Sequence, residues 1–256
     1  MYALERRRQI VALARRDGQV SVVGLAEQLA VAQETIRRDL ADLEGHGLIK
    51  RVHGGAVRID AGPMALRPSS ATGSDTDGLV LAHRVWAQLP RQGTILLGTG
   101  GLGCALAQTI VDDPPEVAGL TVVTNSLDAA VLLSRASRLE VYNIGGTVSP
   151  TTRGQEGDWA VHEMQRLHVD VSVICPAGIS VERGLTQATP AAAAVSQVEV
   201  ASGQRVIALV DADTLGLSSF VQFAGLDEID LIAVSGNPCS AALQPFLDRG
   251  SSIDAG

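Results

Sequence analysis

Residues 31–44 read VAQETIRRDLADLE, and residues 47–56 read GLIKRVHGGA. In the first stretch Ile36, Leu40 and Leu43 recur at the spacing of one face of an α-helix, so they are expected to be buried. The glycines that follow this stretch end the apolar period. The second stretch favours two short strands around a Gly-Gly turn. The sequence therefore predicts a helix followed by a β-hairpin.

Two shorter helices are expected before this helix. Residues 9–14 have helical spacing, and a glycine follows to stop them. Ser21 can cap a second helix in which Leu25 and Leu29 point inward. A tight turn at residues 30–32 then joins the second helix to the third. Three short helices connected in this way are typical of a helix-turn-helix, and the hairpin behind them would be its wing.

The third helix is expected to enter the major groove of double-stranded operator DNA, because recognition helices present their N-terminal residues to base edges. Arginine bonds guanine through two hydrogen bonds, and glutamine bonds adenine in the same way. The predicted DNA-binding residues are Gln33, Glu34, Thr35, Arg37 and Arg38 on the helix, and Lys50, Arg51, His53, Gly54 and Gly55 on the wing. The alternative is a solvated helix with Glu34–Arg38 and Arg38–Asp42 ion pairs.

The letters TIRRDL at 35–40 and RVHGGA at 51–56 resemble the DeoR family of bacterial repressors, and the resemblance spans nearly all of residues 4–57. In that family these letters lie on the recognition helix and on the wing. The family usually has serine where Ala32 stands. Alanine cannot accept a first-turn N–H bond, so we expect this helix start to be about 1 kcal/mol weaker.

Charge is distributed unevenly along the chain. The net charge is −8, yet residues 1–60 hold ten Arg and Lys against eight Asp and Glu, whereas residues 61–256 hold ten against twenty. A mildly basic N-terminal segment followed by an acidic remainder is expected when only the N-terminal segment binds DNA.

Composition also limits the class of protein. No run of 18 apolar residues is free of charge, so no transmembrane helix and no membrane partner are expected. The charged residues 5–8 do not suit a signal peptide, which predicts a cytoplasmic protein. The three cysteines are far apart and lack metal-ligand spacing, so we expect buried reduced thiols, with no metal and no cofactor.

Residues 58–78 have the composition of a linker between a domain at 1–57 and one at 79–250. In the second domain short apolar runs alternate with helical patterns, which predicts an α/β fold with a mostly parallel sheet covered by helices. The expected strands are 94–97, 120–123, 139–144, 169–175, 205–210 and 231–234. The expected helices are 101–111, 126–135, 157–167 and 190–202.

The resemblance continues more loosely through this domain, at TVVTNSL (121–127), IGG (144–146) and AGI (177–179). It implies the Rossmann-like sensor domain of the DeoR family, which is similar to sugar-phosphate isomerases. In the family this domain commonly binds phosphorylated sugars, which abolish or change the binding of the protein to DNA. The resemblance thus implies a repressor of a carbohydrate-metabolism operon that responds to a sugar or a sugar phosphate.

An effector site is expected beyond the carboxyl ends of the strands, where ligands bind in open α/β sheets. The run GTGGLG at 98–103 follows a strand and opens a helix, so it offers backbone N–H groups to an anion. The predicted effector-binding residues are Gly98, Thr99, Gly100, Gly101, Thr124, Asn125, Ser126, Gly145, Gly146, Gly178 and Asp211.

This site departs from the family's pattern in several places. Gly98 stands where the family has aspartate, and Gly101-Leu102 replaces a pair of threonines. Ser196 and Thr214 stand where the family has lysines. Each missing charge-assisted hydrogen bond to a phosphate is worth roughly 1.5–3 kcal/mol. We therefore expect an effector that is less charged than a sugar phosphate.

Two other functions compete with this one. A sugar-phosphate isomerase would need a positioned base, and the candidates are Asp211, Asp213, His83, His162 and His168, which show no catalytic spacing. A constitutive DNA-binding protein would use its second domain only to oligomerise. A homodimer or homotetramer is expected in either regulator, because one winged domain buries little surface and operator DNA is two-fold symmetric.

Overall fold

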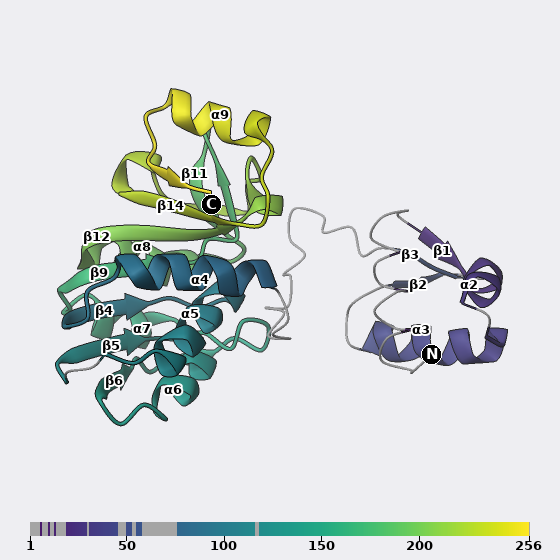
Figure 1. Cartoon of the computed structure of the whole chain (residues 1–256), viewed down its shortest axis with the longest axis horizontal. Coiled ribbons are helices and arrows are strands. Elements are labelled where there is room, and N and C mark those ends of the chain that lie inside the picture. The colour runs from purple at the N-terminus through teal and green to yellow at the C-terminus, as the bar shows by residue number, and fades with distance from the viewer. Residues whose placement is uncertain are drawn as a thin grey trace. The chain divides into compact units, whose positions relative to one another are not determined.

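The computed structural model describes residues 19–29, 31–45, 50–52, 55–57, 76–115 and 118–255, together with Arg6, Ile10 and Leu13. The chain divides into two compact units, residues 1–65 and 66–256 (Figure 1).

The first unit confirms the predicted helix, turn and hairpin. Its described elements are β1 (Gln19–Ser21), α2 (Val22–Gln28), α3 (Gln33–Gly45), β2 (Lys50–Val52) and β3 (Gly55–Val57). Ile10, Leu25, Ile36, Leu40 and Leu43 form one buried cluster, as their spacing predicted. The expected helix over residues 9–14 lies mostly outside the described residues, although Ile10 and Leu13 are helical.

The wing has one more strand than the sequence suggested. β3 pairs antiparallel with both β1 and β2, giving the order β1-β3-β2. A Cβ atom at Gly55 would lie 2.1 Å from the carbonyl oxygen of Val20. Glycine is therefore required at position 55 by the close approach of two strands.

The second unit is built on a seven-stranded parallel sheet. Its strands are β4 (Gly93–Leu97), β5 (Leu120–Thr124), β6 (Leu139–Asn143), β9 (Val169–Ile174), β12 (Gly203–Asp211), β14 (Leu231–Ser235) and β15 (Ile253–Asp254). They lie in the order β15-β14-β12-β9-β4-β5-β6. All six strands expected from the sequence are present, and β15 lies beyond the expected domain end at residue 250.

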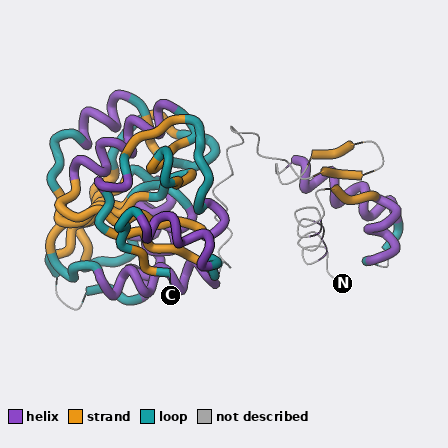
Figure 2. Tube along the Cα trace, turned by 90° about the horizontal axis from the view of Figure 1, so that it is seen from above, coloured by secondary structure: helices purple, strands orange, loops and turns teal. Residues whose placement is uncertain are grey.

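Helices cover both faces of this sheet (Figure 1). They are α4 (Thr76–Gln88), α5 (Gly101–Asp112), α6 (Leu127–Leu133), α7 (Asp158–Met164), α8 (Pro190–Ser202) and α9 (Ser240–Asp248). Ile95 and Leu97 pack in the cluster that holds residues of α4, α5 and α6, whereas Leu96 packs with α7 and α8. This alternation follows the two-residue period of a strand. Figure 2 shows the helices and strands from above.

Two helices and five short strands of the second unit were not expected. Helix α4 begins at Thr76, so the last three residues of the expected linker are helical. Helix α9 contributes Phe246 to a cluster on the far side of the sheet from α4. A small antiparallel sheet, β10 (Gly178–Ser180), β11 (Gly184–Gln187) and β13 (Val221–Ala224), packs in the same cluster. The short strands β7 (Thr147–Val148) and β8 (Gln155–Glu156) pair before α7.

Candidate functional site

Helix α3 presents the predicted DNA-reading residues on its outer face. Gln33, Glu34, Arg37 and Arg38 are exposed, and Thr35 is half-buried. The buried residues of the same helix lie in the core of the unit, so the helix is held by one face and free on the other. The carbonyl oxygen of Ala32 accepts the backbone N–H groups of residues 35 and 36, but its methyl side chain supplies no cap.

The charges on α3 pair differently from the expected pattern. Nη1 of Arg37 lies 3.0 Å from Oε2 of Glu34, one turn earlier, whereas the sequence suggested Arg38 as the partner of Glu34. Both side chains are largely exposed, so this pair contributes little to stability and Arg37 can leave it at small cost. The side chain of Asp42, the other expected partner of Arg38, lies outside the described part.

The third charged position of TIRRDL faces inward. Asp39 is 2% exposed, and its carboxylate forms an ion pair with Arg6. Sequence reasoning missed this pair, although Asp39 lies three residues after Ile36 and therefore on the buried side of the helix. On the wing, Lys50 and Arg51 lie on β2 and Gly55 begins β3. His53 and Gly54 lie outside the described residues.

In the second unit the parallel sheet brings most predicted effector residues to one edge. Residues 98–101 follow β4, residues 124–126 end β5, and Asp211 ends β12, while β9 lies between β4 and β12. Gly145 and Gly146 follow the edge strand β6. Gly178 instead begins β10 in the small sheet.

The glycine run at 98–103 is partly explained by packing. Gly100 has a φ of 137°, and a Cβ atom at Gly103 would lie 2.6 Å from the carbonyl oxygen of Gly98. These glycines are therefore needed to turn the chain tightly from β4 into α5. No side chain caps the start of α5 at Gly100. The N–H of Gly103 is bonded to Cys175, which leaves the N–H groups of Gly101 and Leu102 for a ligand.

Thr124 and Ser126, predicted to meet the effector, also hold the end of β5 in place. The Oγ1 of Thr124 donates to the carbonyl of Leu97 (2.6 Å) and accepts from the N–H of Ser126 (3.0 Å). The hydroxyl of Ser126 accepts from the N–H of Ala129 and caps α6. Asn125 differs, because its buried Oδ1 has no hydrogen-bond partner. Its amide nitrogen donates to a backbone carbonyl.

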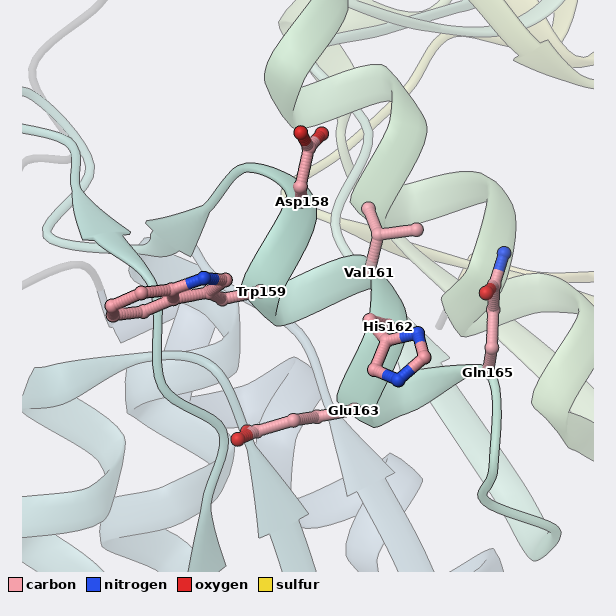
Figure 3. A pocket seen from close by; sticks show the side chains of 6 residues that line it. All are labelled: Asp158, Trp159, Val161, His162, Glu163 and Gln165. Carbon is pink, nitrogen blue, oxygen red and sulfur yellow. The ribbon is translucent and has the colours of Figure 1, made fainter.

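Two hollows of the described surface lie elsewhere, around α7. They measure about 720 and 290 Å³ and flank Trp159, which is 78% exposed. The smaller hollow is lined by Gly146, Thr147, Glu156, Asp158 and Trp159. In Figure 3 the side chains of the larger hollow do not converge, since Trp159 and Gln165 point to opposite sides of the helix. The N–H of Gly145 is already bonded to Glu163 (3.1 Å).

A residue that sequence reasoning missed lies under the glycine loop. Glu199 of α8 is 2% exposed, and a Cβ atom at Gly98 would lie 3.3 Å from each of its carboxylate oxygens. Desolvation by burial raises the pKa of Glu199 to about 7, although a hydrogen bond from Ser196 acts to lower this pKa. The Ser196 hydroxyl also accepts from Nε2 of Gln187 (3.0 Å). The only sequence signal is one acid among small and apolar residues of α8.

The cysteines are less buried than expected. Cys104 and Cys175 are half-buried, and Cys239 is exposed because it precedes α9 at the surface. Desolvation raises the pKa of both Cys104 and Cys175. Within the described ranges no group of His, Cys, Asp or Glu is arranged to hold a metal ion. In that same part of the chain, no helix is long and apolar enough to cross a membrane.

A winged helix-turn-helix joined to a parallel α/β unit defines a DNA-binding transcription regulator with a second, sensor-type domain. Residues 6–61 match the DeoR-like helix-turn-helix domain, and residues 79–235 match the DeoR C-terminal sensor domain. The chain belongs to the DeoR family of transcription regulators.

Curated relatives cover nearly the whole chain. The HTH-type transcriptional regulator GlpR of Haloferax volcanii is 32% identical, over 92% of this chain and 91% of that protein. The HTH-type transcriptional repressor GlcR of Bacillus subtilis is 30% identical, over 97% and 94%. The glycerol-3-phosphate regulon repressor of Escherichia coli K12 is 24% identical, over 99% of both chains.

Solved structures are more distant. A D-ribose-5-phosphate isomerase in complex with phospho-erythronic acid aligns with a TM-score of 0.40 and 16% identity, over 54% of this chain and about half (52%) of that one. A likeness this low carries no weight in deciding function.

Proposed function

We propose that this regulator binds operator DNA through α3 and the wing and represses a carbohydrate-metabolism operon. The observation that carries the proposal is the division of α3 into a buried face and an outer face with Gln33, Arg37 and Arg38. Two relatives are named repressors, one of them of a glycerol-3-phosphate regulon, which supports repression of carbohydrate genes.

The second unit is proposed to sense a sugar or sugar-like effector at the carboxyl edge of the sheet. The uncapped start of α5 and the unpartnered oxygen of Asn125 support this placement. Asp211 accepts a hydrogen bond from Ser235 and ends β12 at the same edge. The competing proposal is a constitutive regulator whose second unit only oligomerises, and a ligand that changes DNA affinity would exclude it.

Catalysis is not part of the proposal. His83, His162 and His168 are exposed and lie on α4, on α7 and just before β9, respectively, so they do not gather around Asp211. General acid-base chemistry needs a base within hydrogen-bond reach of the substrate. We further propose a cytoplasmic homo-oligomer with a DNA-binding domain at 1–57 and a sensor domain from residue 79, joined by a linker.

The test is a footprint on the promoter region of the protein's own gene, repeated with free sugars and their phosphates. A protected site with two related half-sites supports the proposal, and a ligand that weakens protection identifies the effector. Absence of any protected site at micromolar protein and low salt would overturn it.

A further inference from the structure

In the part of the chain that the structure describes, no cation lies beside the carboxylate of Glu199. None of the ion pairs found among the described residues involves Glu199, and the only lysine of the chain, Lys50, is in the first unit. Its hydrogen-bonding neighbour Ser196 is neutral and is itself bonded to Gln187. A buried carboxylate without a cation is costly, so its presence under a ligand-binding loop requires an explanation.

The groups that face this carboxylate add no positive charge. Cys175, at the end of β9, interacts electrostatically with Glu199, with Asp211 and with Cys104 of α5. The cation that reaches Cys104 is Arg153, which is paired with Asp128 at 2.7 Å. Among the described residues, Glu199 therefore faces the thiol of Cys175 and the hydroxyl of Ser196, and a second carboxylate, Asp211, interacts with that thiol.

Glu199 also packs against the loop that leads into the start of α5. Its oxygens pack against Gly98, two residues before the N-cap of α5. A helix start of this kind attracts anions through its free N–H groups. A dianion placed there would face an ionised carboxylate across a protein interior, in which charge repulsion is screened less than in water.

We propose that Glu199 is a specificity-determining residue of the effector site. Its carboxylate disfavours dianionic groups such as phosphate esters, so the loop binds the hydroxyls of an unphosphorylated polyhydroxy compound. This inference rests on the proposed sensing function of the same edge. The raised pKa of Glu199, about 7, agrees with it. Discrimination against dianions should therefore strengthen as the pH rises through neutrality and weaken when Glu199 is protonated.

Sulfate is the suitable probe, because its charge stays constant from pH 6 to pH 8.5 and its binding does not depend on sugar stereochemistry. Calorimetric titration of the full chain, at ionic strength matched with chloride, should show Glu199→Gln binding sulfate at least tenfold more tightly than wild type at pH 8.5. At pH 6 the two proteins should differ by less than threefold. Only the pH dependence of sulfate binding that vanishes in Glu199→Gln is assigned to Glu199.

The matched control is Glu182→Gln, which removes the same charge from an exposed turn between β10 and β11 and should behave as wild type. Equal sulfate affinity of wild type and Glu199→Gln at pH 8.5 overturns the proposal, and so does an absence of binding to both. If Glu199→Gln fails to fold, a wild-type sulfate affinity that does not change with pH overturns it. Footprinting of the same wild-type sample separates this outcome from failure of the DNA-binding function.

Discussion

The Nε atom of Arg6 lies 2.6 Å from Oδ2 of Asp39, and both residues are buried. Asp39 stands directly after Arg38 in the sequence, yet it faces the core while Arg37 and Arg38 face outward. The ion pair therefore ties the start of the chain to the inner side of the reading helix. It adds to the apolar contacts that hold the inner face of α3 against the core.

Asp39→Ala should destabilise the first unit by about 3–5 kcal/mol, because it leaves the buried guanidinium of Arg6 without that partner. DNA affinity should also fall, although Asp39 cannot touch DNA. Urea unfolding of the full chain, followed by circular dichroism, measures the first effect, and a gel shift measures the second. Glu34→Ala breaks only the exposed pair with Arg37 and should cost less than about 1 kcal/mol. Similar losses in the two variants would contradict the role of Asp39.

Arg37→Ala and Arg38→Ala should each weaken specific DNA binding by about 1–3 kcal/mol if the side chain bonds a base. The reason is their exposure at the start of α3, the part of a recognition helix that reaches base edges. A gel shift on the promoter region checks this, with Arg135→Ala in the second unit as a charge-matched control. If the double variant binds this DNA as tightly as the wild type, α3 is not the recognition helix.

Glu199→Gln should change how stability depends on pH. Burial raises the pKa of Glu199 from 4.5 to about 7, so the folded state holds this proton more tightly than the unfolded state. The wild type therefore loses stability as the pH rises from about 4.5 to about 7, and the loss is complete above that range. Between pH 4.5 and pH 8 the variant should gain up to about 3 kcal/mol relative to wild type, at 1.36 kcal/mol per pKa unit. Thermal melts across this range measure it, and parallel curves would refute the assignment.

The protein should be a dimer or a larger oligomer in solution. A single winged domain buries too little surface for tight specific binding, and the two-fold symmetry of operator DNA favours a symmetric partner. Light scattering should give at least twice the chain mass of 26.6 kDa. A monomer both with and without DNA would be incompatible with this prediction.

Periodicity revealed the central strands of the large sheet and missed the short strands of the small one. The central strands are apolar runs bounded by turn residues, so all six were predicted within two residues of their ends. The small sheet of β10, β11 and β13 has strands of three or four residues, too short to show a period. Helix α4 was not among the expected helices, and its start was assigned to the linker because Thr76 and Asp77 follow a Gly- and Ser-rich segment and look like its continuation.

The sequence by itself determined the reading helix, because the spacing of Ile36, Leu40 and Leu43 leaves only one face for the arginines. The tertiary structure alone decided the partners of buried charges. Arg6 meets Asp39 across 33 positions, and Glu199 meets the loop at Gly98 from a distant helix. Local patterns show which side of a helix is buried, but not what lies against it. Contacts between residues far apart in the chain arise only when sheet and helices pack together.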